Sequence, residues 1–147
     1  MVYRDIKKYT SIDDVFGDYD CIALLYEMRP SFGHWVALTR SRERNAIEFF
    51  DPYGYSPDEE LDFVKPEFKR QSGQDFPYLS TLLHLSPYNV TYSNRRIQKK
   101  NKATSSCGRH VLLRCILRDL PVAEYAKLML GAKEKPDDLV TLMTAFV

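Results

Sequence analysis

The feature that most restricts the fold is an abrupt change from polar to apolar residues at Cys107. Residues Asn94–Ser106 are polar and predict a loop. The stretch that follows, Cys107–Arg118, is apolar nearly all round a helical path, through Val111, Leu112, Leu113, Cys115, Ile116 and Leu117. A helix that is apolar on every side must be buried. The sequence therefore predicts a central helix whose first residue is a cysteine.

The rest of the chain predicts strands early and further helices late, which is typical of an α+β fold. Apolar stretches between turn residues predict strands at Asp20–Glu27, His34–Arg40, Ala46–Asp51 and Tyr88–Ser93. Capping and proline patterns predict short helices from Ser11 and Ser56, a helix at 78–84, one from Pro121 to Leu130 with Gly131 as its cap, and one from Pro136. The length of 147 residues fits one domain, residues 1–147.

Composition excludes several classes of protein. The net charge of +1 argues against a globally basic nucleic-acid binder. The longest apolar run, Cys21–Tyr26, is too short to span a bilayer, and the first twenty residues hold no signal-peptide pattern. Three cysteines without a C-x-x-C pair argue against a disulfide framework and a zinc site. We therefore expect a soluble, intracellular monomer that is not secreted, with Cys21 and Cys115 as core thiols and no cofactor or metal.

Charge is distributed unevenly along the chain. Residues 51–67 hold six acidic side chains and one basic one, whereas residues 95–118 hold eight basic side chains and no acidic one. Two solvated faces are the simpler interpretation. The alternatives are a charged groove between the segments and contact of the 95–118 segment with nucleic acid.

Cys107 is a candidate nucleophile. The positive end of the helix dipole stabilises a thiolate at the first residue of a helix, and neighbouring lysines and Arg109 act in the same direction. The alternative is a buried, inert cysteine, a common state for a free thiol.

His34 and Asp51 supply the remaining parts of a nucleophilic site. A hairpin closed by the loop at 41–45 pairs positions whose numbers sum to about 85, so that His34 faces Asp51. Directly opposite Cβ atoms lie about 5 Å apart. A carboxylate at that distance can accept the Nδ1 proton of the imidazole and orient it as a general base. Alone, Asp51 would be the first residue of a turn and His34 a partly buried strand residue.

An oxyanion formed at Cys107 needs hydrogen-bond donors. The backbone N–H of Cys107 and the side-chain amide of Gln98 are the candidates, although Gln98 can also be an ordinary loop residue. His110, which lacks an acidic partner nearby in the sequence, is interpreted as structural, as is His84.

The order His34, Asp51, Gln98, Cys107 resembles the adenain-like cysteine proteases. The words that carry the resemblance are Gly33-His34-Trp35, Phe50-Asp51-Pro52 and Ser106-Cys107-Gly108-Arg109-His110. That family includes the adenovirus maturation protease and relatives in virophages, Polinton/Maverick elements and large DNA viruses, and it shares a clan with SUMO- and NEDD8-specific proteases. The short chain favours the viral branch.

The resemblance implies a circularly permuted papain-like fold, with a small mixed or antiparallel sheet packed on the helix that begins at Cys107. It implies Cys107 as nucleophile, His34 as general base, Asp51 as its orienter, and Gln98 with the Cys107 N–H as the oxyanion hole. Gln98 stands farther from Cys107 than in the family, which leaves Asn94 as the alternative. Trp35, Gly33 and Gly108 would contact substrate.

Three functions follow from this pattern. The first is a cysteine endopeptidase that cuts after small residues or glycine in viral or mobile-element precursor proteins, in the host cytoplasm or nucleus or in the virion. The second is a deubiquitinase or deSUMOylase of the same clan, whose acidic residues Asp58–Asp62 would face a basic modifier tail. The third is a binding module on the same scaffold.

Overall fold

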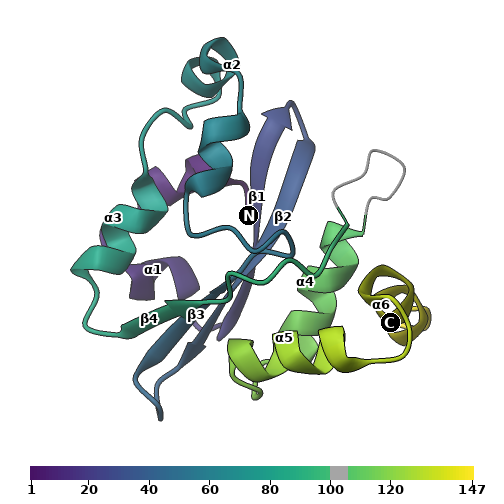
Figure 1. The fold of residues 1–147 in the computed structure, drawn as a ribbon. Helices are drawn as coiled ribbons and strands as arrows, with labels where there is room; N and C mark the ends of the chain where they lie inside the picture. The colour runs from purple at the N-terminus through teal and green to yellow at the C-terminus, as the bar shows by residue number, and fades with distance from the viewer. Residues whose placement is uncertain (100–105) are drawn as a thin grey trace.

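A computed structural model describes residues 1–99 and 106–147. Figure 1 shows a sheet with helices on both of its sides. The elements in chain order are η1 (Tyr3–Lys8), α1 (Ile12–Phe16), β1 (Cys21–Arg29), β2 (Phe32–Ser41), β3 (Ala46–Phe50), η2 (Glu59–Phe63), α2 (Pro66–Gln71), α3 (Tyr78–Leu85), β4 (Asn89–Tyr92), α4 (Cys107–Ile116), α5 (Val122–Gly131) and α6 (Pro136–Met143).

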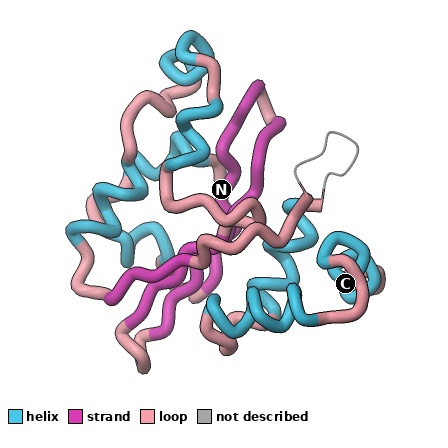
Figure 2. The backbone as a smooth tube through the Cα atoms, in the orientation of Figure 1, coloured by secondary structure: helices cyan, strands magenta, loops and turns pink. Residues whose placement is uncertain are grey.

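The four strands form one sheet in the order β1-β2-β3-β4 (Figure 2). β1, β2 and β3 pair antiparallel, whereas β4 runs parallel to β3. The expected α+β class is confirmed, and of the two kinds of sheet expected, mixed or antiparallel, the structure has the mixed one. No helix among the described residues is long and apolar enough to cross a membrane.

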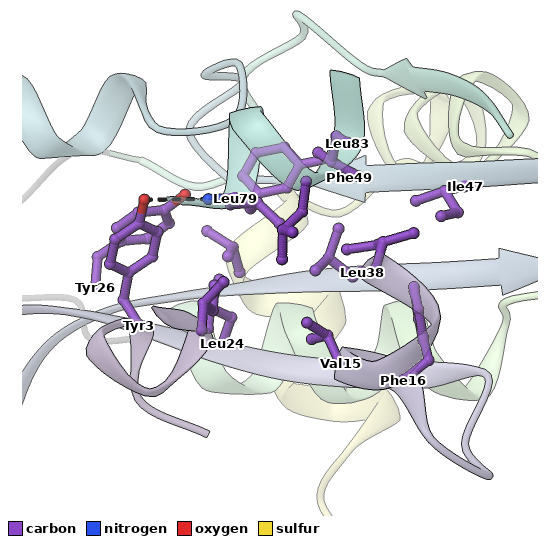
Figure 3. Packing of buried hydrophobic residues seen from close by; sticks show 14 of the residues in the cluster. Tyr3, Val15, Phe16, Leu24, Tyr26, Leu38, Ile47, Phe49, Leu79 and Leu83 are labelled. Carbon is purple, nitrogen blue, oxygen red and sulfur yellow. Dashed lines mark hydrogen bonds between the residues drawn. The ribbon is translucent and has the colours of Figure 1, made fainter. Parts of the chain in front are cut away.

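Both faces of the sheet are covered, and this explains the continuous apolar run of β1. One face packs against η1, α1 and α3 in a core that includes Tyr3, Phe16, Leu38 and Phe49 (Figure 3). The opposite face packs against α4 and α5. The core on this side includes Ala37 of β2 and Phe50 of β3. α4 packs against β2, so the predicted central helix is present. The expectation that it is buried all round is wrong, because Leu112 and Ile116 are exposed.

The predicted pairing of β2 with β3 is wrong by two residues. Leu38 lies opposite Phe49, so paired numbers sum to 87 rather than 85. The turn begins one residue later than predicted, because Ser41 still belongs to β2, where it pairs with Ala46. A shift of two keeps every side chain on its predicted face, since successive side chains alternate across a strand.

Most predicted elements are present, with shifted ends. Ser11 caps α1 through its side chain, which accepts a hydrogen bond from the backbone of Asp14. The acidic helix expected from Ser56 is a 3₁₀-helix that begins at Glu59, and α5 ends on Gly131 with Ala132 as its cap. The sequence analysis missed η1 and α2, both of which are short. Residues 100–105 of the predicted loop lie outside the described part of the chain.

The buried carboxylate of Glu48 joins three elements on the face of the sheet that packs against α4 and α5. Glu48 of β3 accepts a hydrogen bond of 2.7 Å from the guanidinium of Arg114 in α4 and one of 2.8 Å from the backbone N–H of Val122 in α5. Arg114 is fully buried, so this member of the basic 95–118 segment does not belong to a solvated face. Loss of one partner would leave a buried charge uncompensated.

The expectation that Cys21 and Cys115 are core thiols is wrong. They form a disulfide, with their Cα atoms 5.8 Å apart. The pair joins the start of β1 to the last turn of α4 across 94 residues of sequence. Spacing alone could not reveal it, because the fold brings the two residues together. Cys107 is the free cysteine.

Replacing both Cys21 and Cys115 by serine should lower the free energy of unfolding by about 2–4 kcal/mol, because the cross-link restricts the unfolded chain. Urea denaturation without reductant, on a Cys107→Ser background that prevents thiol exchange, measures the difference. In the presence of reductant the two proteins should unfold together. Coincident curves without reductant would contradict the cross-link.

Candidate active site

Gly33 sets the position of His34 at the start of β2. A Cβ on Gly33 would lie 1.8 Å from the carbonyl oxygen of Tyr26 in β1, so that only glycine allows the two strands to approach this closely. Tyr26 is the β1 residue paired with His34. The backbone that carries the imidazole is therefore held in place by its close pairing with β1.

Asp51 follows the last residue of β3 and begins a tight turn. Its carbonyl oxygen accepts a hydrogen bond of 2.8 Å from Gly54 N–H, and its carboxylate Oδ1 accepts one of 2.7 Å from Tyr53 N–H. The predicted turn is thus present. Asp51 both shapes the turn and presents its carboxylate toward β2.

The side chains of His34 and Asp51 are in contact. His34 Nε2 lies 2.7 Å from Asp51 Oδ1, and the two residues are 4% and 2% exposed. The predicted contact is present, but it uses Nε2 and not Nδ1. Because Ala37 pairs with Phe50, Asp51 comes level with Val36 in the observed register and not with His34 as predicted.

Cys107 completes this arrangement from the first position of α4. Its thiol lies beside the His34 side chain, and hydrogen bonding between the two contributes to the pKa shift of each. Burial would lower the pKa of His34, but hydrogen bonds to Asp51 and Cys107 outweigh burial and raise that pKa to about 9. Burial would raise the pKa of Cys107, but His34 and the backbone at Trp35 and Gly108 lower it below its usual value. The two shifts favour a thiolate–imidazolium pair.

Two further residues beside His34 were missed by the sequence analysis. The Tyr53 ring stacks on the imidazole, with ring centroids 4.2 Å apart and planes within 9°. Glu60 of η2 is buried, and its charge also raises the pKa of His34. An acidic stretch in which one carboxylate faces inward gives no periodic signal in the sequence.

His34, Asp51 and Glu60 offer ligand atoms within 4.8 Å of one another. That spacing would suit a metal ion. However, His34 and Asp51 use their facing atoms in the hydrogen bond to each other. We therefore interpret the cluster as electrostatic support for the imidazolium.

A groove of about 540 Å³ opens beside Cys107, and we call it the Cys107 groove. Gly33, Trp35 and Gly108, the three predicted substrate contacts, all line it. A Cβ on Gly108 would lie 3.8 Å from the Trp35 ring, at ordinary contact distance, so folding does not require glycine there. Residues 144–145 and Val147 form part of the wall.

Gln98 does not line the Cys107 groove as the structure describes it. It is 1% exposed and lines a neighbouring cavity with Lys99 and residues 135–138. Its backbone N–H, like that of Ile97, donates a hydrogen bond of 2.8 Å to the carbonyl oxygen of Pro52, beside Asp51. The alternative donor, Asn94, is exposed.

His110 has an acidic partner after all. Its Nε2 lies 2.9 Å from the Oδ1 of Asp137, which is far from it in sequence but lies in the first turn of α6. The two residues are 27 positions apart in the sequence, so no local pattern pairs them. His84 lies exposed at the end of α3.

The geometry can support thiol chemistry. A thiolate at a helix N-terminus, an imidazole within hydrogen-bond reach and a carboxylate that orients the imidazole form the arrangement of an activated nucleophile. The groove gives a second molecule access to the sulfur.

Comparison with known proteins agrees with the predicted resemblance. No protein-family model matches the chain. An uncharacterized protein, V9 of Sputnik virophage, is 38% identical over 148 residues, which cover 98% of this chain and 84% of V9. The chain belongs to the V9 family.

The fold is also that of a solved viral protease. The crystal structure of the ASFV pS273R protease superposes with a TM-score of 0.53 and 17% identity over 95% of this V9-family chain. The chain spans 54% of the length of pS273R. The comparisons thus confirm the expected resemblance to a virophage protein in sequence and to a viral protease in fold.

Replacing Glu60 by glutamine should lower the pKa of His34 below about 9, because the imidazolium loses a nearby negative charge. The imidazolium then persists over a smaller range of pH on the alkaline side. NMR titration of the His34 ring protons measures the shift. Asp62→Asn, which removes an exposed charge from the same 3₁₀-helix, should change little. Equal His34 pKa values in wild type and Glu60→Gln would contradict this assignment.

Proposed function

We propose that the chain is a cysteine endopeptidase in which Cys107 is the nucleophile, His34 the general acid and base, and Asp51 its orienter. The observation that supports this best is the buried chain of contacts from Asp51 Oδ1 through His34 to the Cys107 thiol. The fold likeness to a viral protease supports the same class of reaction. We further propose that the domain is a circularly permuted papain-like one.

The reaction proceeds in two halves. The Cys107 thiolate attacks the carbonyl carbon of a peptide, and the resulting oxyanion is stabilised by hydrogen-bond donors. The C–N bond breaks as the His34 imidazolium gives its proton to the leaving amine, which leaves a thioester on Cys107. Water then attacks the thioester while His34 takes a proton from it, and the carboxylate product and free thiolate are released.

The oxyanion is proposed to lie at the start of α4. The backbone N–H of Cys107 is available there, because the first N–H groups of a helix have no partner within the helix. We assign the second donor to the side chain of Gln98, whose segment is fixed to the Asp51 turn through Pro52. One such donor contributes about 10²- to 10³-fold in rate.

We propose that the substrate is a viral or mobile-element precursor protein cut after small residues. Trp35 and the side-chain-free Gly33 and Gly108 line the Cys107 groove beside the sulfur. We propose that an extended peptide lies along this wall, with small side chains close to the scissile bond. The V9 relative belongs to a virophage, which supports a viral substrate.

Incubation with a proteome-derived peptide library, followed by mass spectrometry of the products, tests the proposal. Wild-type protein should cut after small residues, and Cys107→Ala should leave the library intact. Electrophilic ubiquitin, SUMO and NEDD8 probes run alongside. A folded protein with an alkylatable Cys107 that cuts no peptide would refute the endopeptidase, and a modifier adduct absent from Cys107→Ala would indicate deconjugation.

A further inference from the structure

Asp137 binds three groups from two separate segments of the chain. Its Oδ2 accepts a hydrogen bond of 2.9 Å from the backbone N–H of Lys99. Its Oδ1 accepts from the Ser106 hydroxyl and lies 2.9 Å from His110 Nε2. We call these contacts the Asp137 bridge. Burial would raise the pKa of Asp137, but the three hydrogen bonds lower it below its usual value, so the carboxylate is charged at neutral pH.

The two segments adjoin the two proposed parts of the reaction centre. Lys99 follows Gln98, and Ser106 precedes Cys107. The chain between them passes through residues 100–105, outside the described part. A single carboxylate from α6 therefore connects the residue beside the oxyanion donor with the residue beside the nucleophile.

Ser106 gives independent support for this connection. Serine at the residue before a helix usually caps it, its oxygen accepting a hydrogen bond from the first turn. Ser106 makes no such cap in α4, and its side chain is instead turned toward Asp137, to which its hydroxyl donates a hydrogen bond. The side chain is thereby kept off the first-turn N–H groups that the proposed oxyanion hole requires.

His110 holds the carboxylate from the helix side. It is fully buried, and burial lowers its pKa, so the ring is neutral and donates its Nε2 proton to Asp137. Ser106, His110 and Asp137 do not form a second catalytic triad. In a triad the imidazole lies between the hydroxyl and the carboxylate, whereas here the hydroxyl and the imidazole both bind Asp137 Oδ1.

We propose that Asp137 is a positioning residue of the peptidase, which fixes the Gln98 segment and the N-terminus of α4 relative to each other. The inference rests on the proposed function, because it concerns the same reaction. On the other side of Lys99, the backbone is already fixed, since the carbonyl oxygen of Pro52 accepts hydrogen bonds from the N–H groups of Ile97 and Gln98. The Asp137 bridge supplies the remaining constraint.

Asp137→Asn tests the bridge, because all three partners donate hydrogen bonds and the amide group of asparagine offers one acceptor oxygen in place of two. We expect kcat to fall by about 10- to 100-fold, approaching the loss caused by Gln98→Ala. KM and the rate of Cys107 alkylation by iodoacetamide should change little, since alkylation needs the thiolate and no oxyanion hole. Exchange of the Lys99 amide hydrogen should become faster.

Asp138→Asn is the matched control. It removes the same charge from the same turn of α6, but Asp138 is exposed. It should keep wild-type kcat and Lys99 exchange. If the wild-type protein cleaves peptide, an Asp137→Asn variant whose kcat is unchanged, or whose Lys99 amide exchange is unchanged, overturns the positioning role of Asp137 and leaves the proposed function standing. A wild-type protein that cleaves no peptide overturns the proposed function and, with it, the positioning role.

Discussion

The hydrogen bond between His34 and Asp51 is the contact on which the proposed chemistry depends. It brings an imidazole from the start of β2 to a carboxylate just beyond the end of β3, in a site closed to solvent. A partly desolvated imidazolium is stable there because Asp51 and Glu60 place negative charge around it. That imidazolium in turn stabilises the Cys107 thiolate. The strand pairing thus places beside Cys107 the imidazole that lowers the pKa of its thiol.

The helix that carries Cys107 is held at three points. Asp137 binds residues at its N-terminus. In its last turn, the buried Arg114 pairs with Glu48 of β3, and Cys115 forms the disulfide to β1. Each anchor reaches a different element of the fold. The proposed nucleophile is therefore held through three different elements, which is the kind of rigid support that preorganised catalysis requires.

Local pattern was sufficient for much of the fold. The apolar stretch after Cys107 predicted the central helix, and alternation in β2 and β3 predicted the faces of His34 and Asp51 even though the register was two residues off. The pairing of Cys21 with Cys115, the parallel contact of β3 with β4 and the partnership of His110 with Asp137 were not predicted. Each joins residues that are far apart in sequence, and no local pattern encodes their distance. The stacking of Tyr53 on His34 was missed because it depends on the shape of one turn.

The most direct measurement is the rate of Cys107 alkylation by iodoacetamide as a function of pH, in wild type and in His34→Ala. Because Cys21 and Cys115 form a disulfide, Cys107 is the free thiol that iodoacetamide alkylates. The account predicts a wild-type midpoint below the ordinary thiol value of about 8.5, because His34 and backbone donors stabilise the thiolate. In His34→Ala the midpoint should move to higher pH, since burial then acts without the imidazolium. The same midpoint in both proteins would contradict the thiolate–imidazolium pair.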